Sequence, residues 1–122
     1  VVTVWLRDHR QPVEGGWLPF GQEFGECHRV FGDEAAEVRP GDTVVVVGIG
    51  GIGINAVQGA ASAGATRVVA VDPVEFKREK AMEFGATHTF ASMEDAMPAV
   101  TEMTRGQMAD KVILTPGVLY GD

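Results

Sequence analysis

Six residues in the middle of the chain carry the clearest chemical signal. Residues 48–53 read GIGGIG, and glycine makes up 16 of the 122 residues, about twice its usual share of roughly 7%. A glycine-rich turn lets a ligand approach the backbone, whose N–H groups can then bind phosphates. An acid, Asp72, follows this run by 19 residues. A carboxylate at that distance can accept hydrogen bonds from ribose hydroxyls.

Each glycine of the run has its own physical task in such a turn. Gly48 permits the tight turn, Gly50 leaves room for a pyrophosphate, and Gly53 lets the next helix lie close to the strand. Gly51 and Ile52 open that helix, whose first turn presents free N–H groups and the positive end of the helix dipole. Together with the acid, these residues predict a dinucleotide-binding site.

The elements around the turn support this interpretation. Thr43–Val47 holds four consecutive valines, which is typical of a parallel strand that helices cover on both faces. A helix is expected from Ile52 to about Ala63, and a second buried strand over Arg67–Val71 that ends at the acid. The small helix face that we expect against the sheet consists of Ile52, Ala56, Gly59, Ala60 and Ala63. A glycine motif without these flanking elements would be only weak evidence for a dinucleotide site.

The remaining elements continue the alternation. Glu75–Phe84 reads as a charged helix and Thr87–Phe90 as a short strand. A capping box begins at Ser92, but Pro98 conflicts with a helix that runs straight on, so we expect the regular helix to begin near Pro98. Lys111–Thr115 is the fourth strand. The order predicts an α/β fold, a Rossmann-type open parallel sheet of about four strands in the order 3-2-1-4, with helices on both faces.

The residues after the fourth strand are further candidate contacts. Ligands of an open α/β sheet lie off the C-terminal ends of its strands. We therefore expect the backbone of Thr115, Pro116 and Gly117 near the cofactor. His88 is expected to be structural, and its alternative is packing near the adenine side of the cofactor.

Composition argues against several other classes of protein. The net charge of −7 suits nucleic-acid phosphates poorly, so no nucleic-acid partner is expected. No apolar run is long enough to span a membrane, and no signal peptide opens the chain. The expectation is a cytoplasmic protein without a membrane partner.

Two other kinds of glycine-rich turn are alternatives to a dinucleotide-binding turn. A phosphate-binding P-loop needs Gly-Lys-Ser/Thr, where this chain has Gly53-Ile54-Asn55. S-adenosylmethionine-dependent methyltransferases share a glycine turn and an acid after the second strand. Their turn need not accommodate a pyrophosphate, so the third glycine favours a dinucleotide.

The sequence offers little for a metal site. Cys27 is the only cysteine, and the three histidines are spread over the chain. Cys27 and His28, with Glu23 nearby, could form part of a zinc site, but zinc takes four ligands, one of which can be water. The ordinary interpretation is a surface or half-buried pair. We expect neither a metal ligand nor a catalytic residue in this chain.

Residues 35–122 resemble the cofactor-binding half of the zinc-type medium-chain alcohol dehydrogenases, closest to the actinobacterial nicotinoprotein-like group. The approach EVRPGDTV over residues 37–44 is similar to the family's approach to its first strand, and GIGGIG to its GxGGxG turn. Val71-Asp72, Phe76-Lys77 and the stretch EFGAT over residues 83–87 are similar to the second strand, the helix and the entry to the third strand.

This resemblance implies an NAD(H)-binding portion of an enzyme that transfers hydride between an alcohol and an aldehyde or ketone. It implies NAD as cofactor, a ribose contact for Lys77, and zinc and the small-molecule substrate only in the full-length family member. The chain alone is expected to be inactive. The alternative is a non-catalytic dinucleotide-binding module or fragment, with a methyltransferase less favoured.

The departures from the family pattern suggest how the chain is divided. Most of the family's catalytic domain and its last two strands have no counterpart here. We therefore expect an N-terminal segment over residues 1–36, for which a remnant of the catalytic domain is one candidate origin. Residues 37–122 are expected to form an NAD(P)-binding Rossmann domain that is incomplete at its C-terminus. A homo-oligomer is left open.

Overall fold

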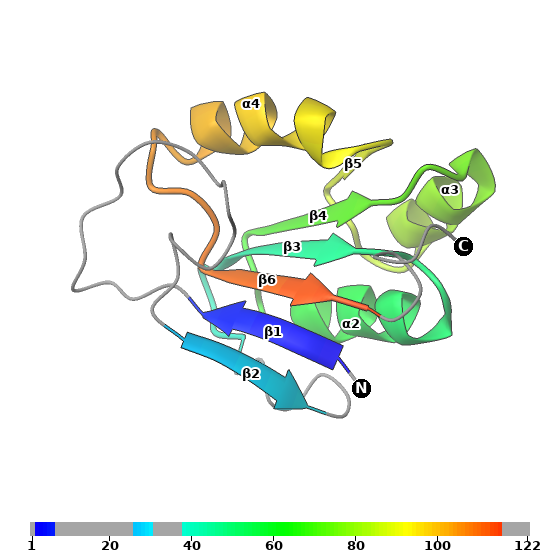
Figure 1. The fold of residues 1–122 in the computed structure, drawn as a ribbon, viewed down its shortest axis with the longest axis horizontal. Helices are drawn as coiled ribbons and strands as arrows, with labels where there is room; N and C mark the ends of the chain where they lie inside the picture. The colour runs from blue at the N-terminus through cyan, green and yellow to red at the C-terminus, as the bar shows by residue number, and fades with distance from the viewer. Residues whose placement is uncertain (1, 7–25, 31–37, 116–122) are drawn as a thin grey trace.

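The computed structural model describes residues 2–6 and 26–30 by their backbone and residues 38–115 in full. Its strands form one sheet in the order β2-β1-β6-β3-β4-β5 (Figure 1). The four that run parallel are β3 (Thr43–Val47), β4 (Arg67–Val71), β5 (His88–Phe90) and β6 (Lys111–Leu114). Their spatial order, β5-β4-β3-β6, confirms the predicted order 3-2-1-4.

Two antiparallel strands extend the sheet beyond β6. β1 (Val2–Leu6) pairs with β6, and β2 (Glu26–Val30) pairs with β1. β2 was not predicted from the sequence. A half-buried strand is recognised in a sequence by alternating apolar and polar residues. The five residues of β2, ECHRV, do not alternate in this way. Pairing with a distant segment defines this strand.

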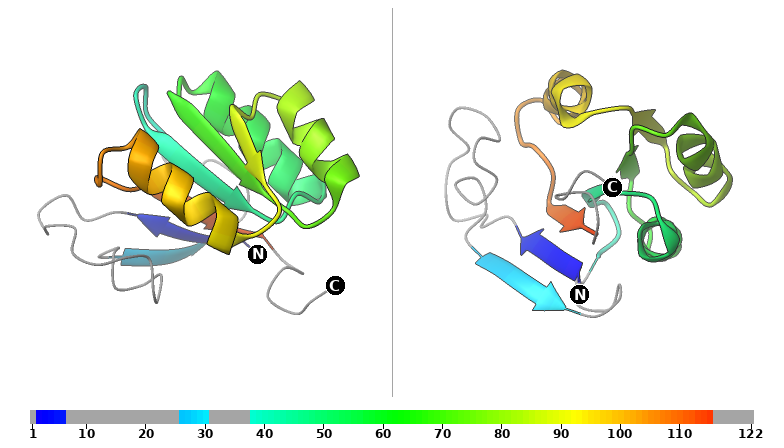
Figure 2. Two further views of the ribbon diagram at one scale, coloured as in Figure 1. Left: turned by 90° about the horizontal axis from the view of Figure 1, so that it is seen from above. Right: turned by 45° about the vertical axis from the view of Figure 1, so that its right-hand side comes forward.

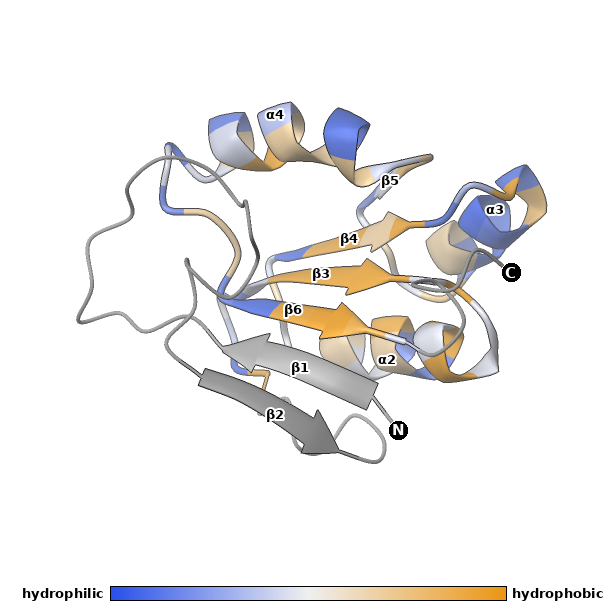
Figure 3. Ribbon diagram, viewed as in Figure 1, coloured by the Kyte–Doolittle hydropathy of each residue, from blue (hydrophilic) through white to orange (hydrophobic). Residues whose placement is uncertain are grey.

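Among the described residues, three helices cover the two faces of the parallel strands, which confirms the prediction of helices on both faces (Figure 2). α2 (Gly51–Ser62) and α3 (Glu75–Glu83) lie on one face, and α4 (Met93–Met103) lies on the other. The strand side chains alternate between them, so that Val44 and Val46 pack toward α2 while Val45 and Val47 pack toward α4. Figure 3 shows the resulting apolar centre, with polar residues on the outer surfaces of α3 and α4.

The face of α2 that meets the sheet differs from the predicted one. The buried residues of α2 are Gly53, Ala56, Val57 and Ala60, whereas Ile52 is 41% exposed. The prediction was therefore wrong at Ile52. In the first turn of α2, Gly53 packs against the carbonyl of Gly48. Because Gly53 faces the inside of the protein, the preceding residue, Ile52, faces solvent.

α4 begins at Met93, so the predicted start near Pro98 was wrong. The Ser92 hydroxyl oxygen accepts a hydrogen bond from the Asp95 N–H at 3.2 Å and caps the helix. Pro98 lies inside the helix, where it removes an N–H from the hydrogen-bond ladder. Burial of Ala96 and Val100 against the sheet and the cap outweigh that loss.

None of the helices in the described ranges is long and apolar enough to cross a membrane.

Candidate functional site

The glycine run forms the turn between β3 and α2, at the C-terminal edge of the parallel strands. Gly48 has a φ of +92°, in the region that only glycine adopts readily. Its N–H donates to the Val71 carbonyl at 2.8 Å, which ties the turn to the end of β4. The backbone conformation itself therefore requires glycine at position 48.

Gly53 is required by packing within the turn. A Cβ atom added to it would lie 1.9 Å from the carbonyl oxygen and 2.9 Å from the carbonyl carbon of Gly48. Both neighbours are backbone atoms, so no side-chain rotation could relieve the clash. The need for glycine here comes from the fold and is independent of any ligand.

Gly50 and Gly51 differ from the other two glycines of the turn. A Cβ atom at either position would meet nothing within 4 Å. Gly50 has an extended backbone with φ −92° and ψ −157°, which residues with side chains also adopt. Neither packing nor conformation explains these two glycines. The open space in front of them can admit a ligand against the backbone.

The start of α2 is also open to an anion. Gly50 is its N-cap residue, so no side chain caps the helix, and its first turn holds no acidic residue. The first N–H groups of a helix have no partner within it and carry the positive end of the dipole. The other two helices in the described part of the chain have acids in their first turns, Glu75 in α3 and Glu94 with Asp95 in α4.

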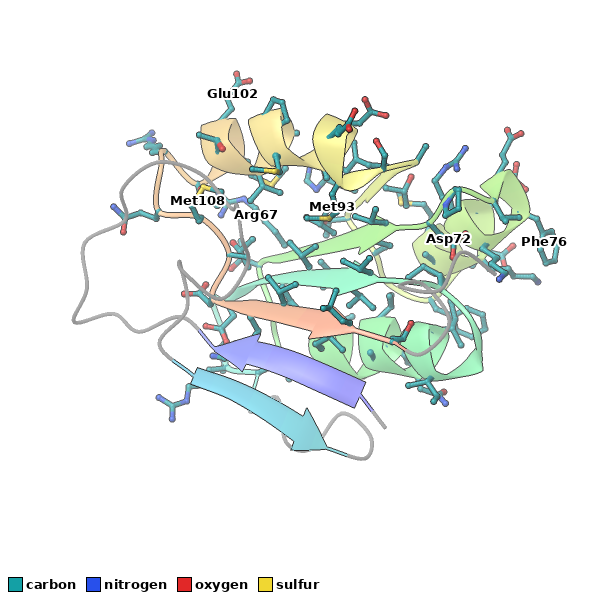
Figure 4. All side chains as sticks on the ribbon, viewed as in Figure 1. Arg67, Asp72, Phe76, Met93, Glu102 and Met108 are labelled. Carbon is teal, nitrogen blue, oxygen red and sulfur yellow. The ribbon has the colours of Figure 1, made fainter. Side chains whose placement is uncertain are left out.

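Asp72 lies at the end of β4 and is only 4% exposed (Figure 4). One carboxylate oxygen accepts from the Ile49 N–H and the other from the Val74 N–H, each at 2.8 Å. The Asp72 N–H donates to the Phe90 carbonyl at 3.1 Å. The acid therefore joins the glycine turn to the β4–α3 connection and to β5. Each carboxylate oxygen keeps a further lone pair that can accept a hydrogen bond.

This bracing role of Asp72 was not predicted. The sequence contains part of the signal, because an aspartate often accepts from the backbone N–H two residues further on, as Asp72 does from Val74. The bond to Ile49 spans 23 residues and has no local signature.

Thr115 follows β6 and is buried beside the turn. Its N–H donates to the Val47 carbonyl at 3.1 Å, and its hydroxyl lies 2.8 Å from the Gly48 carbonyl oxygen. The predicted residues Gly48, Asp72 and Thr115 thus come together from the ends of three neighbouring strands. Pro116 and Gly117 lie outside the described residues.

Lys77 lines a groove of about 290 Å3 between the start of α2 and the side of α3. The lining residues are Ile49, Gly50, Gly51, Ile54, Phe76, Lys77, Lys80 and Phe84. Within residues 38–115, no carboxylate lies in ion-pair distance of the Lys77 ammonium group. Most residues that line the groove are apolar or glycine, and among residues 38–115 the Lys77 ammonium group next to the glycine turn has no ion-pair partner.

A metal site is not formed by the residues that the structure describes, since no three His, Cys, Asp or Glu residues gather among them. Cys27 and His28 are neighbours in β2, and their side chains lie outside the description, as does Glu23. His88 is exposed in β5, with Nδ1 at 2.9 Å from the Thr87 hydroxyl.

Comparison with known proteins matches residues 51–119 to the family model described as zinc-binding dehydrogenase. Over 85 residues the chain is 66% identical to the NDMA-dependent alcohol dehydrogenase of Amycolatopsis methanolica, covering 70% of this chain and 23% of that protein. It is 55% identical over 86 residues to alcohol dehydrogenase B of Mycobacterium tuberculosis, with the same two coverages. The chain thus spans about a quarter of the length of these relatives.

Solved structures show the same likeness. A putative alcohol dehydrogenase from Thermotoga maritima matches with a TM-score of 0.57 and 38% identity, over 62% of this chain and 19% of that one. An alcohol dehydrogenase zinc-binding domain protein from Burkholderia ambifaria matches with a TM-score of 0.53 and 43% identity, over 57% and 19%.

Proposed function

The chain belongs to the zinc-binding dehydrogenase family, and from this premise we propose that it is the NAD(H)-binding portion of a zinc-type alcohol dehydrogenase. The parent reaction would be hydride transfer between a small alcohol and an aldehyde or ketone. We assign cofactor binding to residues 37–122. Residues 1–36 would form a separate N-terminal segment that contributes β1 and β2 to the edge of the sheet.

The observation that carries the proposal is the open start of α2. Gly50 and Gly51 face empty space, and the helix they begin has neither a side-chain cap nor an acid in its first turn. A pyrophosphate in that space would accept hydrogen bonds from the unpaired N–H groups and lie at the positive end of the dipole. The residues therefore fit the phosphates of a dinucleotide.

Asp72 supports NAD in preference to NADP. The free lone pairs of its carboxylate could accept from the ribose hydroxyls of NAD, and Lys77 could contact the same ribose from the groove. A 2′-phosphate would instead meet a negative charge, which costs roughly 1 kcal/mol in water and about 4 kcal/mol at a partly shielded site at 4 Å. Lost hydrogen bonds add about 1–3 kcal/mol. We expect NAD to be favoured at least about tenfold.

The described residues do not fit zinc, so we assign no step to a metal in this part of the chain. Bound NAD would supply the hydride acceptor or donor. The residues named here would only hold it, with the glycine turn at the phosphates and Asp72 and Lys77 at the ribose. Activation of the alcohol would belong to other parts of a family enzyme.

The direct test is fluorescence titration of the native chain with NADH. We expect saturable binding, and the absence of binding to a folded chain would overturn the proposal. Titration of NADH and NADPH against Asp72→Ser tests the acid. Because this variant also loses two acceptors for backbone N–H groups, its thermal unfolding must be recorded, and the ratio of the two affinities is the informative quantity. We expect most of the preference for NADH to disappear.

A turnover assay separates an enzyme from a non-catalytic binding module. We expect no alcohol oxidation by the isolated chain, even with added zinc. Zinc-dependent turnover above that of a Cys27→Ser, His28→Ala control would show that the N-terminal segment supplies a metal site. An upstream Cys…Gly-His-Glu…Cys set in the full gene would favour the enzyme.

A further inference from the structure

Three cationic side chains on α3 occupy different environments. Lys80 is exposed, pairs with Glu83 at 3.4 Å and lies 5.7 Å from the centre of the Phe76 ring. Lys77 lines the groove beside the glycine turn, as Lys80 also does, but Lys77 has no ion-pair partner among residues 38–115. The guanidinium of Arg78 contacts the backbone carbonyl of Asp72, at the end of β4. Lys80 is thus already occupied at the surface, while the other two flank the C-terminal edge of the sheet.

Arg78 is held beside Asp72, the residue to which we assign the ribose of the proposed dinucleotide. Its guanidinium donates to the backbone carbonyl of Asp72 at 2.8 Å, in a partly buried bond. Among residues 38–115, no carboxylate pairs with it. A guanidinium carries five N–H donors, so this contact fixes the position of Arg78 and leaves most of its donors for a ligand.

Asp72 and Arg78 therefore bring opposite charges to the same end of β4. The carboxylate of Asp72 is buried and bound to two backbone N–H groups, and the guanidinium of Arg78 is bound to the carbonyl of the same residue. A 2′-phosphate would be repelled by the first group and attracted by the second. Selectivity between two ligands is the difference between such effects.

We propose that Arg78 is a specificity-determining residue that binds the 2′-phosphate of NADP(H) and so limits the discrimination imposed by Asp72. The planar fork of arginine suits a phosphate better than a lysine does. The native chain would still prefer NADH, but it would bind NADPH more tightly than the acid alone permits. This inference rests on the proposed dinucleotide site.

Titration of Arg78→Gln with NADH and with NADPH tests the inference. We expect NADPH affinity to fall by about tenfold to a hundredfold, as for a lost charged hydrogen bond, and NADH affinity to change by less than about twofold. Arg78→Lys keeps the charge without the fork and should retain an intermediate NADPH affinity. Arg39→Gln is the matched control, because Arg39 is exposed and lies shortly before the N-terminal end of β3, whereas the proposed site lies at the C-terminal ends of the strands. It should leave the ratio of affinities unchanged.

Equal weakening of both cofactors by Arg78→Gln would show that Arg78 acts only as a brace on Asp72, and no change in either affinity would also overturn the inference. Circular dichroism melting reports whether the variant is folded. If Arg78→Gln does not fold, the native chain and Arg78→Lys are compared with 5′-AMP and adenosine 2′,5′-bisphosphate by calorimetry. Equal affinity ratios in those two proteins would be contrary evidence. Failure of the proposed function itself is distinct, since the native chain would then bind no NADH.

Discussion

The starts of α2 and α4 differ in how their free N–H groups are satisfied. At α4, Ser92 accepts a hydrogen bond from the backbone, and Glu94 and Asp95 place negative charge in the first turn. At α2, Gly50 offers no side chain, and the first turn holds no acid. Glycine in place of a capping side chain costs about 0.2–0.5 kcal/mol of stability. The N-cap of α3, Val74, also makes no side-chain hydrogen bond, but Glu75 places an acid in its first turn, so among the described helices only α2 lacks both.

The glycines of the turn show the same division between fold and ligand. Gly48 and Gly53 are needed by the protein itself, one for its positive φ and the other for its contact with the Gly48 carbonyl. Gly50 and Gly51 are needed by neither conformation nor packing. A single motif thus contains two structural glycines and two whose absence of a side chain benefits only a bound molecule.

The largest expected effect comes from a structural glycine. Gly53→Ala would place Cβ against the Gly48 carbonyl and should destabilise the protein by about 3 kcal/mol or more, at the upper end of overpacking effects. Gly51→Ala is the matched control, and it should be neutral or stabilising by up to about 1 kcal/mol because alanine favours the helix. Urea unfolding measures both free energies. Equal stabilities of the two variants would remove the distinction between the glycines.

Gly50→Val should separate binding from folding. The branched side chain would fill the open space in front of the helix and keep phosphates from the N–H groups. We expect NADH affinity to fall by more than about tenfold, equivalent to 1.4 kcal/mol, in a protein that still unfolds cooperatively. Unchanged NADH affinity in the folded variant would place the phosphates elsewhere.

Ser92→Ala should act on stability alone. Loss of the hydroxyl acceptor at α4 should cost about 1 kcal/mol and leave NADH affinity unchanged, because α4 lies on the other face of the sheet from α2. Thermal unfolding and NADH titration on the same preparation provide the two values. A marked loss of binding would mean that the two helix starts are coupled.

The smallest expected effect comes from adding an acid to the first turn of α2, which tests directly how this helix differs from α3 and α4. Ile52→Glu would give α2 the acidic first turn that α3 and α4 already have, at a side chain that is 41% exposed. Stability should rise by about 0.3–1 kcal/mol through the helix dipole, while NADH affinity should fall because the new carboxylate repels the phosphates. Stability and binding changing in the same direction would contradict the assignment of this helix start to an anion.

Local signals made much of the region from β3 to β6 predictable. The bounds of β3 and β4 agree with the predicted ranges, because runs of valine and neighbouring branched residues specify buried strands within a few positions. The predicted start of α4 was wrong because it rested on the local cost of Pro98 in a helix. The burial of Ala96 and Val100, which offsets that cost, depends on tertiary packing. The predicted strand order was enough to place the candidate residues at one edge of the sheet. It did not predict which backbone groups Asp72 and Thr115 contact there.

The sequence by itself determined the alternation of strands and helices, the glycine turn and the acid that follows it, because each depends on residues close together in the chain. Only the tertiary structure decided that β1 lies beside β6, that Asp72 braces Ile49, and that Thr115 contacts Gly48 across 67 positions. These contacts join segments whose separation along the chain carries no periodic or local signal. They form when the packing of the sheet and its helices brings the strand ends together.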